Sequence, residues 1–581
     1  MLRINNINKK NAYFYKYFKQ THKNLKMKKQ FLVLSISLLF LLNLNAQTAK
    51  TTITWGSEFM SPKKHVFTGV LGNPKDGYVS INQRYGKSLT LQKFNTDLKL
   101  KSENAVDLKT MPKGYMSEFF LDMNNKYYWV YSTWDKKAKI EQLNVRPIDI
   151  STAKLTGKST PVIKSDKKLA GDLVATGFYK IGTANKWESE LSDNGSKVLV
   201  HYRLKPEIKD DSKNKDVIGL YVFDSEFEEI SGRRVEMPYV EEFLDIMSYQ
   251  IDNAGNAYIL GKVYEGSKKE KTKDKKPNYH FEIFKYTKDN SEAIKISLKL
   301  ESTFVSSIKL VEGKEGNMIL VGYYSKSTYG AADGVFCFNL NSTTNKIENK
   351  FKGFYEFPSD IMKAYEKSRT AKKVNDKEAK DANELTSLKI KDIMVNEDGS
   401  FDVFGEEYTH IWYVRINNRR VEYVHKLIYG DIYVMRIGAD GEMKQVNKIP
   451  KYQFKSLTTS SPVLANEVFG MSFYLDKKDG NYFIYYVDNL KNLNIKATDA
   501  PERHVDGAGG VLMSTKLGSD GSLTKNKLFD FREKKYYINV TEMDRIGPND
   551  YVALAYAYSD SPFAYLTFNS KPKKFVQISV K

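Results

Sequence analysis

The sequence predicts an all-β fold, a β-propeller of about eight four-stranded blades. Three observations predict it: a tight polar turn recurs eight times along the chain, a run of aromatic and β-branched residues follows each turn, and most of these hairpins precede a second hairpin. Two hairpins cannot bury their faces alone, whereas a ring of stacked four-stranded blades can. A repeat of this size therefore favours a propeller.

The eight turns contain Asn, Asp or Gly, the residues that tolerate the positive φ of a hairpin turn. The turns at Gly255 and Gly316, which are the clearest copies, lie 61 residues apart. The full set is Asp76-Gly77, Asn124-Asn125, Asn194-Gly195, Ala254-Gly255, Glu315-Gly316, Asp398-Gly399, Asp479-Gly480 and Asn549-Asp550.

A second hairpin is expected after most of these turns. The best examples turn at Asp289-Asn290, Asp440-Gly441 and Asp520-Gly521, and the chain is expected to end on two strands, 563–568 and 575–580. Each unit is then strand, tight turn, strand, loop, strand, tight turn, strand. A seven-bladed ring, two smaller propellers or an array of β-sandwiches remain as alternatives.

The first 46 residues are predicted to be an N-terminal extension and a signal peptide, and residues 47–581 the propeller. Lys28 and Lys29 precede an apolar run of 12 residues, 31–42, and Ala46 suits the position before a cleavage site. The run is shorter than the ~20 residues that span a bilayer. We therefore expect a secreted or periplasmic protein without a transmembrane span after cleavage; an uncleaved N-terminal anchor is the alternative.

Residues 360–384 interrupt the repeat. They are rich in Lys, Ala, Asp and Glu and are predicted to form a short helical or charged insertion. Cys337, the only cysteine, lies in an apolar strand-like run and is expected to be a small buried residue. One cysteine cannot form a disulfide within the chain.

The net charge of +21 falls to +12 without the nine Lys and Arg residues of the leader, which holds no acid. This mild excess favours anionic partners, such as an anionic polysaccharide, an envelope protein or a lipid surface. Nucleic acid is not expected, because the sequence contains no basic helix and no aromatic RNA-binding motif.

Chain geometry suggests which face binds. In each unit the tight turns lie at one end, and the longer, more variable loops lie at the other, where binding residues are commonly found. Residues that leave the second strand of each unit should surround this long-loop face. The ligand-binding candidates are Arg84, Tyr85, Trp134, Arg203, Tyr264, Tyr324, Glu406, Glu407 and Tyr408, and the same positions hold Asp135, Tyr202, Glu265, Tyr323, Asp488, Asn489, Tyr556 and Tyr558.

Arg, Tyr and Trp are frequent anchors of binding surfaces. The simpler interpretation is that Tyr is common at strand ends because it fits a half-buried pleated surface.

Signals of catalysis are weak. Glu406 and Glu407, with His410 close by, are the best carboxylates, yet neighbours on a strand point to opposite sides and make a poor acid–base pair. The seven histidines show no metal-ligand spacing. We therefore expect no metal and no cofactor, leave catalytic residues unassigned, and favour a binding protein over an enzyme.

Three segments, 430–436, 448–451 and 482–489, give the second half of the chain a family resemblance. It resembles exported proteins of unknown function from Bacteroidota-type bacteria, with a propeller-like fold. The resemblance implies location and fold, and no activity. The leading hypothesis is an exported binding or scaffold module of the cell envelope. An enzyme acting on a polysaccharide or a peptide, with acidic residues on the same face, and a structural envelope component are the rivals.

Overall fold

The structure is a computed structural model that describes residues 50–84, 88–106, 111, 115–177, 180–208, 210–268, 272–273, 276–298, 300, 303–327, 332–348, 350–364, 383–417, 420–459, 471–505, 510–557 and 572–581. The chain divides into two compact units, Thr52–Ser579 and Met1–Thr51 with Val580–Lys581. The architecture below is that of Thr52–Ser579. The predicted signal peptide lies outside the described residues, as does most of the predicted insertion, of which residues 359–364 are helical.

All eight predicted turns join the first and second strands of an antiparallel sheet, and seven of them contain a residue with positive φ. The first strands are β2 (Val66–Asn73), β6 (Met116–Met123), β13 (Glu188–Leu191), β17 (Leu244–Ile251), β23 (Phe304–Glu312), β28 (Asn383–Val395), β33 (Phe473–Lys478) and β39 (Asp544–Gly547). The second strands are β3 (Gly77–Arg84), β7 (Lys126–Asp135), β14 (Lys197–Arg203), β18 (Ala257–Tyr264), β24 (Met318–Ser325), β29 (Phe401–Asn417), β34 (Asn481–Asp488) and β40 (Asp550–Ala557).

The second hairpin of each sheet follows the predicted order. The third strands are β4 (Ser88–Phe94), β8 (Ile140–Asp149), β15 (Lys215–Asp224), β21 (Tyr279–Tyr286), β25 (Gly334–Asn341), β30 (Arg420–Ile437), β36 (Val511–Leu517) and β41 (Lys573–Val580). The outer strands are β5 (Leu100–Ala105), β10 (Thr160–Ser165), β16 (Glu229–Val240), β22 (Ile294–Leu298), β26 (Lys346–Glu348), β31 (Met443–Ile449), β37 (Leu523–Asp530) and β1 (Thr51–Trp55).

Short elements complete these sheets and their connections. Strands β9 (Lys154–Leu155), β27 (Phe354–Glu356), β32 (Gln453–Thr459), β35 (His504–Val505) and β38 (Tyr536–Ile538) extend sheets, and β11 (Asp172–Gly177) with β12 (Lys180–Ala184) and β19 (Thr272–Lys273) with β20 (Lys276–Pro277) form separate hairpins. Short helical elements among the described residues include α3 (Phe531–Lys534), η2 (Glu241–Phe243), η3 (Lys314–Gly316), η4 (Leu490–Asn492) and η5 (Val540–Glu542). Among the residues described, no helix is both long enough and apolar enough to cross a membrane.

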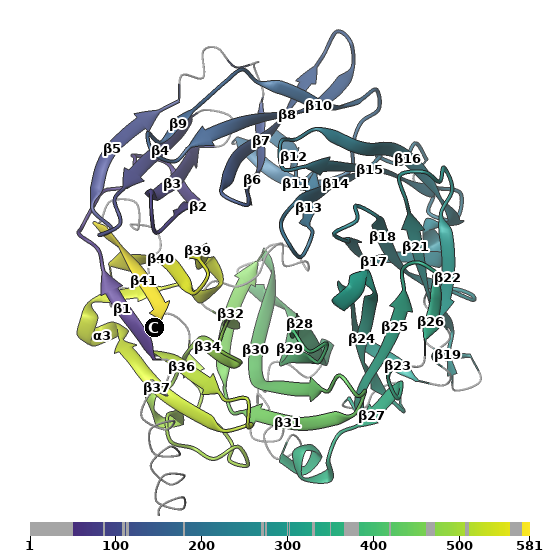
Figure 1. Ribbon diagram of the computed structural model, residues 1–581, viewed down its shortest axis with the longest axis vertical. Coiled ribbons are helices and arrows are strands. Elements are labelled where there is room, and N and C mark those ends of the chain that lie inside the picture. Colours follow the sequence, from purple (N-terminus) through teal and green to yellow (C-terminus); the bar gives the residue numbers. More distant parts are fainter. Residues whose placement is uncertain are drawn as a thin grey trace, which may run out of the picture. The chain divides into compact units, whose positions relative to one another are not determined.

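The hydrophobic core is divided into clusters that lie between consecutive sheets. Figure 1 shows these sheets following one another in the order of the chain. One cluster joins the first sheet to the last: Tyr78 and Phe94 pack with Leu554 and Phe575. The last sheet also takes its outer strand from the beginning of the unit, because β1 pairs with β41. The cluster and the strand pairing together tie the two ends of the succession of sheets to each other.

The prediction of an all-β propeller fold is confirmed. Eight sheets of four to six strands are present among the described residues. The number of blades of the whole chain stays a prediction, since residues outside the described ranges are not counted. Cys337 is buried in β25, as expected.

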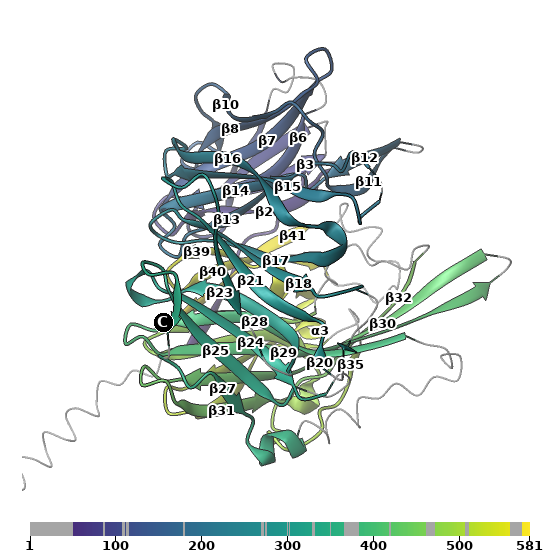
Figure 2. The ribbon, with the colours of Figure 1, turned by 90° about the vertical axis from the view of Figure 1, so that its right-hand side faces the viewer.

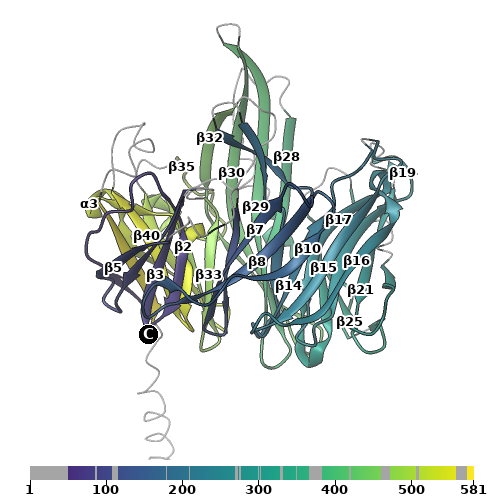
Figure 3. The same cartoon turned by 90° about the horizontal axis from the view of Figure 1, so that it is seen from above.

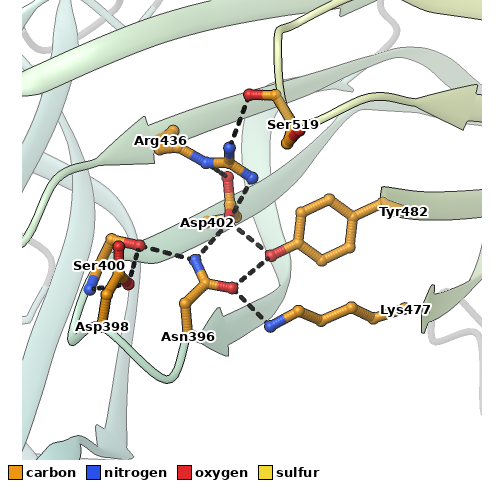
Figure 4. A network of polar contacts seen from close by, with 8 residues as sticks. All are labelled: Asn396, Asp398, Ser400, Asp402, Arg436, Lys477, Tyr482 and Ser519. Carbon is orange, nitrogen blue, oxygen red and sulfur yellow. Dashed lines mark hydrogen bonds and ion pairs between the residues drawn. The ribbon is translucent and has the colours of Figure 1, made fainter. Parts of the chain in front are cut away.

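Polar side chains reinforce the packing of sheets at the tight-turn end. The buried carboxylate of Asp402 accepts hydrogen bonds from Arg436 Nε at 2.8 Å and from the Tyr482 hydroxyl at 2.5 Å (Figure 4). Asn396 bonds to the same carboxylate and to Lys477 Nζ. Because these residues come from β28–β30 and from β33–β34, the network joins two neighbouring sheets.

One sheet projects beyond the others. Strands β29 and β30 have 17 and 18 residues, and their hairpin extends past the neighbouring sheets together with parts of β28 and β32 (Figures 2 and 3). The hairpin joins a second strand to a third, so it lies at the predicted long-loop end. By connectivity β11–β12, β19–β20 and residues 359–364 also belong to that end.

A buried carboxyl at the junction of the first and last sheets gives a pH prediction. Asp544 Oδ2 in β39 accepts the Val70 N–H of β2 at 2.8 Å, and burial, with a smaller effect of Glu542, raises the pKa of Asp544 to about 7. An unfolded Asp has a pKa of about 4. The folded protein therefore holds this proton more tightly, and the associated stability is lost as the pH rises from about 4 through about 7.

The substitution Asp544→Asn removes this titration while keeping an oxygen that can accept the Val70 N–H. We expect the decrease in melting temperature between pH 5 and pH 8 to be smaller in the variant than in the unchanged protein. Thermal melts across this range measure it. An equal decrease in both proteins would contradict the role assigned to Asp544.

Candidate ligand-binding site

The predicted binding residues differ in how exposed they are in the structure. Arg84 is exposed and Trp134 partly exposed at the ends of β3 and β7, so both remain accessible on the long-loop face. Tyr85 and Tyr558 lie outside the described residues.

Three candidates are buried and serve the fold instead of the surface. Tyr324 packs edge-to-face on Phe354. Glu406 binds Lys451 Nζ at 2.6 Å, and Glu407 accepts the Asp431 N–H. Their assignment as surface anchors is corrected: these three side chains are covered by other parts of the protein, which sequence position alone does not show. Other predicted positions that are buried are Tyr202, Tyr323 and Asp488.

Tyr408 and Tyr264 are neither fully exposed nor fully buried. Tyr408 is half-buried, with Lys389 Nζ 3.7 Å from its ring centroid. The Tyr264 hydroxyl donates to Asp245 Oδ2 at 2.7 Å. His410 pairs with His425, its Nε2 lying 3.0 Å from Nδ1 of that ring. The predicted grouping of His410 with the glutamates therefore does not form a catalytic arrangement.

A cavity lies between the sheet of β13–β16 and the sheet of β17–β22, at their long-loop end. Its volume is about 1070 Å³. It is lined by Arg203 and Tyr202, two of the predicted positions, by the beginning of β17 and by loops that precede β11 and β13. The charged lining residues are Lys186, Glu188, Arg203, Lys205, Asp211, Asp216, Glu241, Asp245 and Lys268.

Arg203 is positioned by an ion pair across two strands. Its Nη1 lies 3.0 Å from Oδ1 of Asp216 in β15; the arginine side chain is 46% exposed and the aspartate 5%. Beside it the Tyr202 ring lies directly over Gly219, where a Cβ would come within 2.1 Å of the ring. Glycine at this position therefore permits the close approach that forms the cavity wall.

His201 and Tyr249 form a stacked pair against the cavity. Their ring centroids are 3.7 Å apart at an interplanar angle of 20°. His201 is 3% exposed, and burial lowers its pKa to about 3, so the ring is neutral at physiological pH. Its Nε2 has no hydrogen-bond partner among the described residues and lies 3.8 Å from Glu188 Oε2. A buried polar atom without a partner is costly unless a ligand or water bonds to it.

Two other cations of the cavity are paired as well. Lys268 Nζ lies 2.7 Å from Asp245 Oδ1, and Lys186 is paired with Glu141. Burial opposes ionisation of Asp245, but hydrogen bonds from Lys268 and Tyr264 lower its pKa overall. The cavity therefore presents a mixture of fixed donors and acceptors and has no strong excess of either charge.

The carboxyl of Glu241 near Arg203 has a shifted pKa. Burial, followed by the charge of Asp216, raises the pKa of Glu241, while Arg203 partly offsets the effect.

Within the described residues no group of three or more His, Cys, Asp or Glu lies close enough to hold a metal ion.

Sequence reasoning found Arg203 but missed His201, Tyr249 and the carboxylates opposite them. His201 directly precedes Tyr202 and Arg203. A prediction that took in one more residue at the end of each second strand would have included it. Asp216 and Asp245 lie at or near the starts of β15 and β17, the strands that leave the long-loop end. A prediction that also considered the first residues of the strands that leave this end would have identified both Asp216 and Asp245.

Neither protein-family models nor curated proteins gave a match to this sequence. Among solved structures, the chain is similar to the WD40 domain of SCAP from fission yeast, with 8% identity, 92% of this chain and 96% of that chain covered, and a TM-score of 0.32. The Nup133 β-propeller domain of Vanderwaltozyma polyspora gives 10% identity, 80% and 99% coverage and a TM-score of 0.29.

Acylaminoacyl peptidase from Pyrococcus horikoshii is also similar, with 10% identity, 87% of this chain covered and a TM-score of 0.31. The chain spans only 58% of that peptidase. These likenesses are too distant to carry any conclusion about activity.

Proposed function

We propose that this protein is a binding module whose ligand occupies the cavity between the sheets of β13–β16 and β17–β22. The observation that supports it most directly is His201, whose buried Nε2 has no partner among the described residues and lines a cavity of about 1070 Å³. A volume of this size is typical of small-molecule sites. The cavity lies at the end where the long loops gather.

The charges of the cavity favour an uncharged, polyhydroxylated ligand, that is, a neutral oligosaccharide. Of the four cations that line the cavity, Arg203, Lys186 and Lys268 each have a carboxylate partner, so a polyanion that bound to these three would have to displace existing ion pairs. Sugar hydroxyls both donate and accept, and can bond to the two members of such a pair at once. The exposed Met247 and the Tyr249 ring add apolar surface for a sugar face.

Export is part of the proposal. It rests on the charged and apolar pattern before Ala46 and on the resemblance of the second half of the chain to exported bacterial proteins. An exported module of this kind would hold glycans at the cell envelope.

A glycan-cleaving enzyme at the same site is the second candidate. One observation favours it: Glu241, whose pKa is raised by burial, lies in the cavity wall together with Asp216, and a carboxyl of raised pKa can act as a general acid. Incubation with the bound oligosaccharide distinguishes the two, because an enzyme yields shorter products and a binding module does not.

The proposal predicts a loss of affinity in two variants. Isothermal titration of the purified chain with a panel of neutral tetrasaccharides should identify a ligand. His201→Phe keeps the stack on Tyr249 but removes the ring nitrogens, and Arg203→Ala removes the guanidinium. Each is expected to weaken binding by about 30-fold, the loss typical of an anchor residue.

Arg84→Ala is the matched control. Arg84 ends β3 as Arg203 ends β14, but it does not line the cavity, so its removal should leave the affinity unchanged. Tighter binding of an anionic oligosaccharide such as oligogalacturonate, or unchanged affinity in His201→Phe at an unchanged melting temperature, would overturn the proposal.

A further inference from the structure

A second cavity lies at the opposite end of the first strands. It has a volume of about 600 Å³ and shares no lining residue with the cavity described above. Its walls come from the ends of β13, β17, β23 and β28, from β33, and from the beginnings of β39 and β40. Strands of six different sheets thus converge on it.

Carboxylates outnumber cations around this second cavity. Asp193, Glu312, Asp392 and Asp476 line it, against Lys477 and Arg545. Both cations bond elsewhere. Lys477 donates to Asn396 in the network around Asp402 (Figure 4), and Arg545 donates to the carbonyls of Gly547 and Pro548.

The two carboxylate oxygens of Asp476 differ in their hydrogen bonding. The side chain is 2% exposed, and its Oδ1 accepts the Tyr551 hydroxyl and the Lys477 N–H, both at 2.7 Å. Its Oδ2 has no hydrogen-bond partner among the described residues. Leaving a buried carboxylate oxygen unpaired costs free energy, and a cationic donor in the cavity would remove that cost.

The other carboxylates are held less tightly than Asp476. Glu312 accepts the backbone N–H of Asn253, and Asp392 Oδ1 forms a long ion pair with Lys309 Nζ at 3.9 Å. Burial raises the pKa of Asp476 and of Asp392, and that of Glu312 to about 7. Burial therefore disfavours the charged forms of these groups, and a cation in the cavity would favour them.

The arrangement fits several separated ammonium groups better than one metal ion. No three metal-binding side chains of the described residues converge on a point, because the acids stand on different strands. Two aromatic rings, Tyr474 and Tyr551, meet edge-to-face at 5.1 Å and line the same cavity. Aromatic walls and spaced carboxylates together favour an extended organic cation.

We propose that this cavity binds a linear polyamine, whose ammonium groups bond to Asp476 and to the carboxylates around it. The inference is independent of the oligosaccharide site, since the two cavities share no residue.

Titration of the full chain with spermidine tests the proposal. We expect one site per chain, weaker binding of the shorter diamine putrescine, and no displacement of spermidine by equimolar Ca²⁺. Asp476→Asn should weaken spermidine binding by about tenfold or more, the usual effect of losing a charge-assisted hydrogen bond. Asp97→Asn, an exposed change away from both cavities, should leave the affinity unchanged.

Glu312→Gln serves as a second variant, because Asp476 is buried and its replacement could unfold the chain. Thermal melts show whether each variant is folded, and oligosaccharide binding should be unaffected in both. Equal affinity for spermidine in a folded Asp476→Asn or Glu312→Gln variant would overturn the proposal, as would displacement by Ca²⁺. Tighter binding of tetralysine than of spermidine would assign the site to lysine side chains of a peptide and overturn the polyamine.

Discussion

Replacing Glu406 by Ala is expected to lower the free energy of unfolding by about 3–5 kcal/mol, the usual cost of leaving one buried charge without its partner. Glu406 and Lys451 are both buried, with 2.6 Å between Oε1 and Nζ. Ser472 Oγ also donates to Glu406 Oε2, at 2.5 Å. The variant therefore leaves the Lys451 ammonium in the interior with fewer acceptors. Urea denaturation followed by circular dichroism measures the loss.

Two controls separate the buried charge from the simple loss of a side chain. Glu226→Ala breaks an exposed ion pair with Lys126 and should change the unfolding free energy little. The double variant Glu406→Leu with Lys451→Met replaces both charges by apolar groups and should recover much of the stability lost in Glu406→Ala. If Glu406→Ala were as stable as the unchanged protein, the Glu406–Lys451 pair would not contribute to the stability of the fold.

Replacing Trp129 by Ala is expected to destabilise the protein by a similar amount, about 3–5 kcal/mol, because a large cavity opens in the core. Trp129 in β7 is fully buried and stacks on Tyr131 at 4.5 Å between ring centroids. Its Nε1 donates to Ser117 Oγ at 2.9 Å. The residue lies in the cluster between the first and second sheets, so the variant weakens their packing.

Trp134→Ala is the matched control, since Trp134 ends the same strand but is partly exposed. It should lower the melting temperature only slightly. A loss equal to that of Trp129→Ala would show that the cost comes from the strand itself and not from the buried position. Thermal melts and urea titrations of both variants give the comparison.

Glu406 and Trp134 show that a sequence pattern can place a residue at a strand end without predicting whether its side chain is exposed. Glu406 and Trp134 both occur at predicted strand ends, and the sequence pattern predicts the same role on the binding face for both. The structure buries the first and exposes part of the second. Burial depends on which neighbouring sheet covers a strand end, and that neighbour is separated from it by tens of residues.

The sequence by itself determined the hairpins of this protein. Turns such as Asp398-Gly399 and Asp479-Gly480 are specified by residues that tolerate positive φ, and the strands on either side are adjacent in the chain. Such local contacts need no other part of the molecule, which is why all eight first hairpins could be predicted.

Only the tertiary structure decided how the hairpins meet. The pairing of β1 with β41 joins residues more than 500 positions apart, and the cavity beside Arg203 requires His201, Asp216 and Tyr249 from three strands of two sheets. Nothing in a local pattern specifies such contacts, because they arise from the stacking of whole sheets, whose hydrophobic faces select their neighbours by shape and burial.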